Sequence, residues 1–242
     1  MVEPASIPAR SAPSLLALSL ACFVFALPAK AEKGTPAAAR PPSPEVARVV
    51  REVQQRYDAT TDFTADVTQE MIVASLGKTL TAQGTVAFMR PGKLRWQLSD
   101  GSGQLIVADG TTLWLYQPEE KQVIKAPFQS AFRASTPISF LLGVGRIGDD
   151  FDVSLDAESH TGEDPLIWLK LIPRQSDGTV GWLRLGVNPS TYDIATAEVH
   201  DQLDNVTRLR FRNLKRDVKL EASLFHFKVP EGVDVVEAPI GF

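Results

Sequence analysis

The chain has 242 residues, with 25 Lys and Arg against 29 Asp and Glu, which gives a net charge of −4. This mild acidity argues against nucleic-acid binding, because that function needs a concentrated basic face. The single cysteine excludes any disulfide within the chain.

The first predicted element is a secretory signal at residues 1–31. Arg10 precedes a short apolar run, and the segment ends in Ala29-Lys30-Ala31, an A-x-A cleavage pattern. The apolar run is too short for a membrane-spanning helix, which needs about 20 residues. We therefore expect cleavage near Ala31, which would remove Cys22 and leave a mature chain without thiols.

Cys22 leaves a second interpretation of the N-terminus open. It follows Ser19-Leu20-Ala21, which loosely resembles a lipobox, although Leu is expected where Ser19 stands. Lipidation at Cys22 would anchor the protein to a membrane. The position of the A-x-A pattern favours ordinary cleavage over this alternative.

A linker and a helix follow the signal. Residues 32–43 are rich in Pro and Ala, which predicts a disordered linker. Ser43 is a good N-cap, and Pro44 suits the first position of a helix that we expect to reach Tyr57. One apolar stripe at helical spacing should pack on a sheet. It consists of Val46, Val49, Val50, Val53 and Tyr57.

The segment from Gly84 to Pro118 predicts four strands joined by three turns. Arg90-Pro91-Gly92-Lys93 places Pro and Gly where a type II turn needs them, and Asp109-Gly110 is a strong hairpin signal. Leu105–Val107 and Leu113–Tyr116 are apolar on both faces, whereas a sheet with one wet face should alternate. We therefore expect these strands to be covered on both sides.

Alternation predicts further strands before and after this meander, about eleven in all. The last of them should contain Phe225, Phe227 and Val229. A second helix is predicted at Pro137–Leu142, with Thr136 as its N-cap. Such a sheet can close into a barrel or stay open around a cavity, and periodicity alone does not choose between them. The additional strands are predicted at Asp62–Val73, Thr79–Met89, Lys121–Lys125, Phe151–Ala157, Ile167–Pro173, Gly181–Val187, Asp193–Asp201 and Val206–Leu214.

These motifs resemble one family in their order and spacing. Residues 89–96 (MRPGKLRW), residues 105–118 (LIVADGTTLWLYQP) and residues 227–235 (F-x-V-P-E-G-V-D-V) are similar to segments of the LolA family of periplasmic lipoprotein carriers. The resemblance implies a single domain over residues 44–242. Its fold would be mainly β with a helical lid: an incomplete, open antiparallel β-barrel over an apolar cavity that short helices close.

The resemblance also implies roles for individual residues. Arg90 matches an Arg that holds the lid shut through main-chain carbonyls, here around Leu141 and Leu142 or on the first helix. A guanidinium suits this role because it offers five donors and stays charged. The residues implied to line the acyl-chain cavity are Phe88, Leu94, Trp96, Ile106 and Trp114. The residues implied to form the lid are Val50, Val53, Ile138, Phe140, Leu141 and Leu142.

The function implied is that of a soluble periplasmic carrier, which binds the acyl chains of lipoproteins released from the inner membrane and delivers them to the outer membrane. Its partners would be acylated lipoproteins, an inner-membrane ABC lipoprotein-releasing complex and an outer-membrane receptor. The alternatives are a lipid-anchored outer-membrane receptor, which lipidation of Cys22 would indicate, and a lipid sensor of the same half-barrel fold. We expect a monomer.

The sequence lacks the usual signatures of an enzyme or a metal site. His160, His200 and His226 each stand alone, and there is no H-E-x-x-H, C-x-x-C or G-x-S-x-G motif. We therefore predict no catalytic activity, no metal site and no cofactor.

Overall fold

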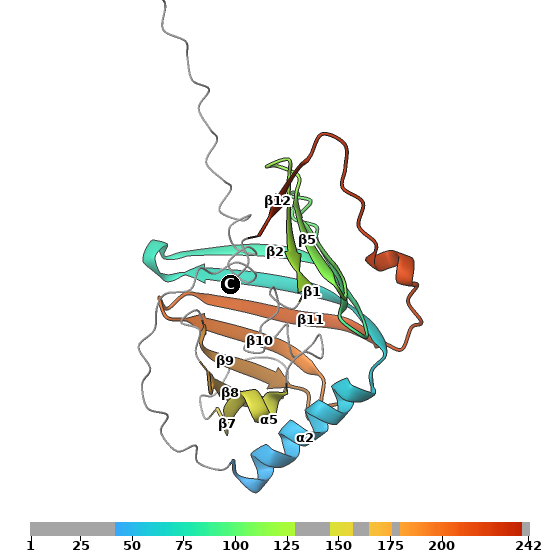
Figure 1. Ribbon diagram of the computed structural model, residues 1–242. Coiled ribbons are helices and arrows are strands. Elements are labelled where there is room, and N and C mark those ends of the chain that lie inside the picture. The colour runs from blue at the N-terminus through green and yellow to red at the C-terminus, as the bar shows by residue number, and fades with distance from the viewer. Residues whose placement is uncertain (1–41, 129–145, 157–164, 176–179, 239–242) are drawn as a thin grey trace, which may run out of the picture.

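The computed structural model describes residues 42–128, 146–156, 165–175 and 180–238. The predicted signal peptide, most of the predicted linker and the predicted helix Pro137–Leu142 lie outside these residues. The described part is one sheet of twelve strands with few helices (Figure 1). The helices are α2 (Pro44–Ala59), α5 (Ile147–Asp150) and the short 3-10 turns η1 (Ala74–Leu76) and η2 (Ala222–Phe225).

The strands from Asp62 onward begin and end within one or two residues of the predicted bounds, except the last. They are β1 (Asp62–Val73), β2 (Lys78–Met89), β3 (Lys93–Leu98), β4 (Leu105–Asp109), β5 (Thr112–Gln117), β6 (Gln122–Pro127), β7 (Phe151–Leu155), β8 (Ile167–Pro173), β9 (Val180–Val187), β10 (Ile194–Asp201), β11 (Val206–Arg216) and β12 (Asp234–Glu237).

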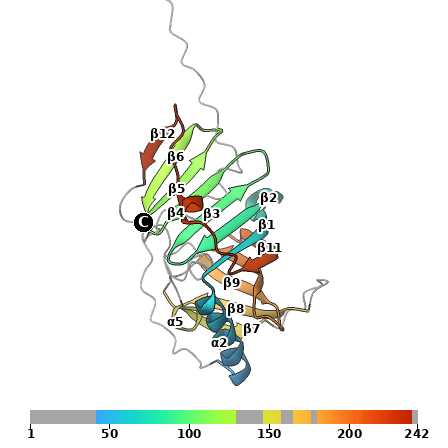
Figure 2. The ribbon, with the colours of Figure 1, turned by 90° about the vertical axis from the view of Figure 1, so that its right-hand side faces the viewer.

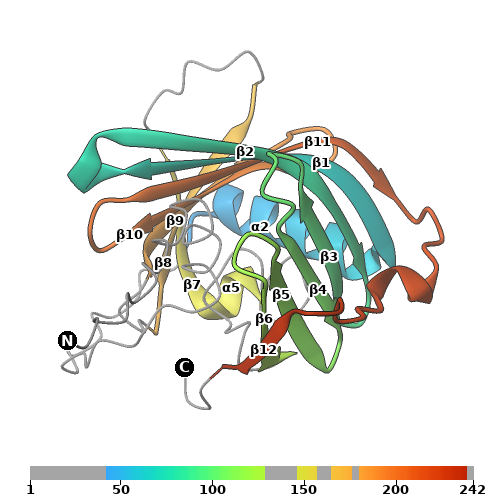
Figure 3. The ribbon, with the colours of Figure 1, turned by 90° about the horizontal axis from the view of Figure 1, so that it is seen from above.

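The sheet is open, as the family resemblance implied. Its strand order is β12-β6-β5-β4-β3-β2-β1-β11-β10-β9-β8-β7, so that β12 and β7 are its two edges. Neighbouring strands are antiparallel except for the β12–β6 pair, which is parallel. The sheet curves strongly, and α2 lies on its inner side (Figures 2 and 3). The inner face is therefore concave.

Helix α2 begins as predicted and runs two residues past Tyr57. The Ser43 side chain accepts a hydrogen bond from Val46 N at 3.3 Å, and Pro44 occupies the first turn. The predicted apolar stripe faces the sheet, because Val46, Val49, Val53 and Tyr57 are all buried. Packing of this stripe, more than helix propensity, holds the helix in place.

Two apolar clusters cover the concave face. The first spans β1 to β6 and includes Phe63, Val86 and Leu115. The second spans α2, α5 and β7 to β10 and includes Phe151 and Leu183. Phe211 on β11 packs against both clusters, so the apolar surface is continuous from one half of the sheet to the other.

The convex face of β3 to β5 is covered by the segment after β11. Phe225 is 1% exposed, and the Phe227 ring lies 6.0 Å from the rings of both Trp114 and Tyr116. Arg95 on β3 reaches the carbonyl oxygen of Leu224 at 3.5 Å. The prediction that these strands are covered on both faces is thus confirmed for the convex side of the sheet.

The predicted last strand at Phe225–Val229 is wrong. This segment forms η2 and an irregular stretch, and the last strand is β12, which pairs with β6. Phe225 and Phe227 both pack on the convex face, so their alternation reflects burial against the sheet and not membership of a hydrogen-bonded ladder. Ion pairing between Lys125 and Glu237, at 2.9 Å, joins β6 to β12.

Strands β2 and β3 approach each other closely at Gly84. A Cβ atom at Gly84 would lie 2.2 Å from the carbonyl oxygen of Gln97 and 3.1 Å from Leu98 Cα, so only glycine fits without a backbone shift. This close approach lies in the meander that carries Leu94 and Trp96.

We expect Gly84→Ala to lower the free energy of unfolding by about 2–3 kcal/mol, because the added methyl group overlaps main-chain atoms that cannot move independently. Urea unfolding would measure this. Thr85→Ala, at the exposed neighbouring position, is the control and should change stability by less than about 1 kcal/mol. Equal stability of Gly84→Ala and the wild type would contradict the close approach.

Candidate functional site

The concave face holds most of the residues predicted to line a cavity. Phe88, Leu94, Trp96 and Ile106 belong to the first apolar cluster and are each 2–4% exposed. The antiparallel register explains their shared direction, because Phe88 lies opposite Leu94 and Trp96 lies opposite Ile106. The edge of the Trp96 ring faces Phe211, with 6.5 Å between ring centroids.

Trp114 was predicted to line the same cavity, and the structure places it on the opposite face. It lies opposite Val107 and packs against Phe227 on the convex side, whereas its neighbours Leu113 and Leu115 belong to the concave cluster. Side chains alternate along a strand, and in a strand that is apolar on both faces the sequence alone does not say which set faces inward.

The predicted lid is only partly described. Val53 is fully buried in the second cluster, and Val50 packs against that cluster at its edge. These residues of α2 therefore cover the β7 to β10 half of the concave face. The predicted lid residues Ile138, Phe140, Leu141 and Leu142 lie outside the described residues.

Arg90 lies where β2 ends and reaches the C-terminal end of α2. Its Nη2 donates to the carbonyl oxygen of Tyr57 at 2.8 Å, and its Nε donates to the carbonyl oxygen of Thr60 at 3.1 Å. Asp58 is an additional acid partner at 3.8 Å. These acceptors lie on the first helix, which is one of the two places that the resemblance implied. The other, around Leu141, lies outside the described residues.

Helix C-termini leave carbonyl groups unpaired and carry a partial negative charge, so a cation is favoured there. Arg90 satisfies both needs at once, with a side chain that is 28% exposed. The β2–β3 turn that follows Arg90 is compact: Gly92 has φ +63°, as the predicted turn requires, and the Phe128 ring packs against it.

A second arginine, Arg216 at the end of β11, meets the same helix end, and sequence reasoning missed it. Its Nε donates to Thr60 Oγ1 at 3.1 Å, it forms an ion pair with Asp193, and its guanidinium lies 5.7 Å from the centre of the Tyr57 ring. Burial raises the pKa of Tyr57 to about 12, although the charge of Arg216 opposes this shift. No local motif marks Arg216, because it is far from α2 in the sequence.

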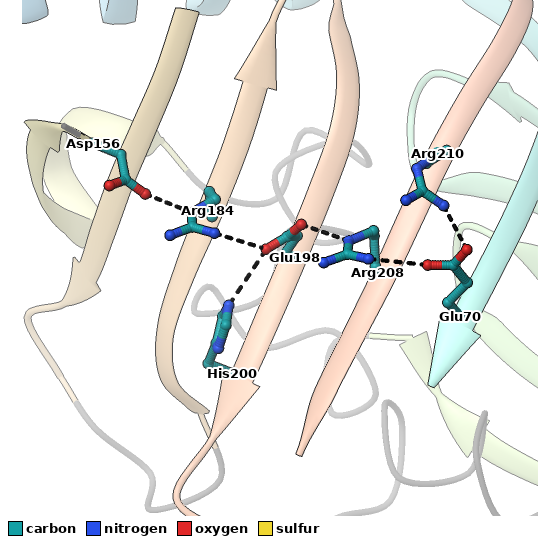
Figure 4. Close-up of polar contacts among 7 residues, drawn as sticks. All are labelled: Glu70, Asp156, Arg184, Glu198, His200, Arg208 and Arg210. Atoms are coloured by element: carbon teal, nitrogen blue, oxygen red, sulfur yellow. Dashed lines mark hydrogen bonds and ion pairs between the residues drawn. The ribbon is translucent and has the colours of Figure 1, made fainter. Parts of the chain in front are cut away.

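The convex face carries the largest group of charged residues among those described. Figure 4 shows that they form an ion-pair ladder across neighbouring strands. Arginines and carboxylates alternate along it. Glu198 lies 2.6 Å from Arg208 and 3.3 Å from Arg184, and Glu70 lies 3.1 Å from Arg208. The ion-pair ladder consists of Asp156, Arg184, Glu198, His200, Arg208, Glu70 and Arg210.

Glu198 is the most buried acid of this ion-pair ladder, with 5% of its side chain exposed. Burial acts to raise its pKa, but contacts with His200 and Arg208 and the charges of Arg208 and Arg184 outweigh burial and lower the pKa to about 2. A carboxylate paired with two arginines is held ionised and is a poor proton acceptor at neutral pH. Glu198 therefore acts as a structural ion-pair partner of the arginines on the neighbouring strands.

Within the described ranges, no three His, Cys, Asp or Glu side chains are grouped so that they could hold a metal ion. The helices of the same ranges also include none that is both long and apolar enough to cross a membrane.

An open, curved β-sheet with an apolar inner face, and a helix held against that face at one end by an arginine, defines the half-barrel class of carrier folds. The chain belongs to the LolA family: the family model described as outer membrane lipoprotein carrier protein LolA matches residues 58–228.

Relatives agree with this membership. An outer-membrane lipoprotein carrier protein of Nitrosomonas europaea is 31% identical over 81% of this chain and 92% of its own. One from Bordetella avium is 33% identical over 76% of this chain and 83% of its own. An uncharacterised conserved protein of Thermus thermophilus shares the fold, with a TM-score of 0.51 at 17% identity over 79% of this chain and 98% of its own.

We expect Glu198→Gln to destabilise the protein by about 3 kcal/mol at pH 7, because it leaves Arg184 and Arg208 short of a buried counter-charge. The pKa of Glu198 is lower in the folded chain than its ordinary value of 4.5, so its stabilisation is complete above that pH and is lost as the pH falls toward about 2. Urea unfolding at several pH values should show the two proteins converging below pH 4.5. Glu119→Gln, at an exposed turn, is the control, and a difference that does not vary with pH would contradict this.

Proposed function

We propose that the protein is a soluble periplasmic carrier, which binds the acyl chains of lipoproteins released from the inner membrane and delivers them to the outer membrane. The observation that carries this proposal is the continuous apolar surface on the concave face of an open sheet. The names of the relatives, outer-membrane lipoprotein carrier proteins, support the same function.

The energetics of acyl chains require such a surface. Burial is worth about 0.8 kcal/mol per CH₂ group, so one C16 chain represents roughly 12 kcal/mol and does not cross water unaided. A carrier must offer comparable apolar area when loaded and cover that area when empty, because large exposed apolar patches cause aggregation. Phe88, Leu94, Trp96 and Ile106 would contact the chains, and α2 with Val50 and Val53 would form part of the cover.

Arg90 is proposed to stabilise the empty, closed state. Cargo shifts a closed–open equilibrium only through its greater affinity for the open state. Two charge-assisted hydrogen bonds to Tyr57 and Thr60 carbonyls hold α2 against the sheet and thus oppose loading and favour release.

The proposed cellular setting follows from the same role. Cleavage near Ala31 would release the mature chain into the periplasm, where an inner-membrane ABC lipoprotein-releasing complex would load it and an outer-membrane receptor would unload it. The carrier would act without catalysis. The alternative, a lipid-anchored receptor of the same fold, requires acylation at Cys22, which mass spectrometry of the mature N-terminus would detect.

Tryptophan quenching tests where acyl chains bind. Of the four tryptophans, Trp96 alone faces the concave surface. On the convex side, Trp114 packs on Phe227 and Trp182 stacks on His200. Trp168 lies opposite Gly186, on the face that carries the ion-pair ladder. We expect a dibrominated stearic acid to quench a protein that retains Trp96 alone strongly, because bromine quenches on contact.

The first protein would carry Trp114→Phe, Trp168→Phe and Trp182→Phe. The matched control retains Trp114 alone, with Trp96→Phe in place of Trp114→Phe, and should show little quenching. Unbrominated stearic acid corrects for other effects of binding. Quenching of both proteins to the same extent, or of neither, would refute acyl binding on the concave face.

We expect Arg90→Leu to bind a fluorescent fatty acid up to about tenfold more tightly and to release it more slowly to liposomes, since loss of about 1.4 kcal/mol from the closed state favours loading. Titration and stopped-flow transfer measure the two effects. Arg51→Leu, at an exposed position on α2, is the control. Unchanged affinity and release in Arg90→Leu would exclude the latch role.

A further inference from the structure

The restraints on α2 are unevenly distributed along the helix. Burial of Val46, Val49 and Val53 holds its first half and its middle through apolar packing. The polar contacts of this part are long: Arg48 reaches Tyr192 Oη at 3.5 Å, and Gln54 Oε1 accepts from Ile147 N at 3.4 Å. The short, directional contacts gather at the other end, around Tyr57 and Thr60. Thr60 Oγ1 donates to the carbonyl oxygen of Arg56 at 2.8 Å and accepts from Arg216.

The two arginines at this end come from the two strands that flank β1. Asp62 at the start of β1 lies opposite Met89, the residue before Arg90, and Phe63 lies opposite both Phe88 and Arg216. Because β1 follows α2 after only Thr60 and Thr61, the helix end lies over the start of β1. A neighbour on each side can therefore reach it.

The two arginines differ in what each would keep if the helix moved. Among the described residues, the hydrogen bonds and the ion pair of the Arg90 side chain are all made to residues 57–60. Arg216 also forms an ion pair with Asp193, the residue before β10. The side chains of this pair are 10% and 21% exposed, so both are more buried than that of Arg90, which is 28% exposed. Asp193 in turn accepts from Arg56 Nε at 3.3 Å. Arg216 and Asp193 thus form an ion pair on the sheet that binds the C-terminal end of α2; we call this pair the socket.

The junction after the helix is tied down as well. Asp62, which is 3% exposed, accepts from Val218 N at 2.8 Å, and Asp217 accepts from Thr61 N at 3.0 Å. Asp217 N also donates to the carbonyl oxygen of Asp62 at 2.8 Å. The chain just after Thr60 is therefore fixed to the residues that follow β11 by both main-chain and side-chain contacts.

We infer that the Arg216–Asp193 pair is a fixed pivot for α2: when acyl chains enter, the helix rotates about this pair, so that its N-terminal half swings and the Tyr57 and Thr60 carbonyls turn away from Arg90, while its C-terminal end keeps its place over β1. Arg216 and Asp193 are positioning residues, because they contact α2 and not the cargo surface. This inference rests on the proposed function for the swing itself, whereas the seating of the helix end is a property of the protein without cargo.

Spin-label distances test the pivot in the full protein with Cys22→Ala, so that only introduced thiols react. One pair joins Ala59→Cys to Gln83→Cys, and the other joins Glu45→Cys to Gln83→Cys; all three sites are exposed. On addition of stearic acid, we expect the distance distribution from Glu45 to shift and broaden and that from Ala59 to stay narrow. Equal shifts at both positions would overturn the pivot.

Variants test the residues. Without stearic acid, Arg216→Gln and Asp193→Asn should both broaden the Ala59 distribution, and Arg216→Lys, which retains the charge, should broaden it less. Arg212→Gln replaces an exposed arginine on the same strand and should match the wild type. An Ala59 distribution in Arg216→Gln as narrow as in Arg212→Gln would refute the socket.

The two proposals fail separately. If stearic acid does not bind to the wild type, the carrier function is contradicted, and the comparison of Arg216→Gln with Arg212→Gln still decides whether the socket seats the helix. If stearic acid binds and Arg216→Gln leaves both the Ala59 distribution and the affinity unchanged, the carrier function stands and the pivot is wrong. With a correct pivot, we expect Arg216→Gln to change the affinity for stearic acid by twofold to tenfold.

Discussion

An antiparallel sheet that does not close must cover its inner face by other means. A closed barrel fills its interior with its own side chains, whereas this sheet ends at β7 and β12 and leaves a continuous apolar surface on its concave side. That surface cannot remain in water without a cover, and a cover that is not covalently closed can be displaced. In the proposed function, an acyl chain would displace such a cover.

The two faces of the sheet are stabilised by different kinds of contact. The convex side is held by groups that satisfy one another: the ion-pair ladder around Glu198 ties β9, β10, β11 and β1 together, and Phe225 and Phe227 seal β3 to β5. The concave side is held mainly by apolar packing. Directional bonds thus lie where the structure must stay fixed, and non-directional contacts lie where a ligand with a long alkyl chain would bind.

The residues of the candidate site show how far sequence reasoning reached. Phe88, Leu94, Trp96 and Ile106 lie together on the concave face because alternation and hairpin turns set their direction. The prediction for Trp114 was wrong, because its strand is apolar on both sides and alternation does not tell which set of side chains faces inward. Arg216, Asp193 and Asp62 could not be found, because long-range pairing across β1 and β11 brings them to the end of α2.

The sequence by itself determined the local elements: the capped helix at Pro44, the Gly92 and Asp109-Gly110 turns, the antiparallel meander and, through motif order, the family. These depend on neighbours within a few residues, where capping, turn geometry and periodicity act. Only the tertiary structure decided which face of each doubly apolar strand turns inward, which segment covers the outside, and which arginines meet the end of α2. Those outcomes depend on the curvature of the whole sheet and on pairing between distant strands, which no local pattern encodes.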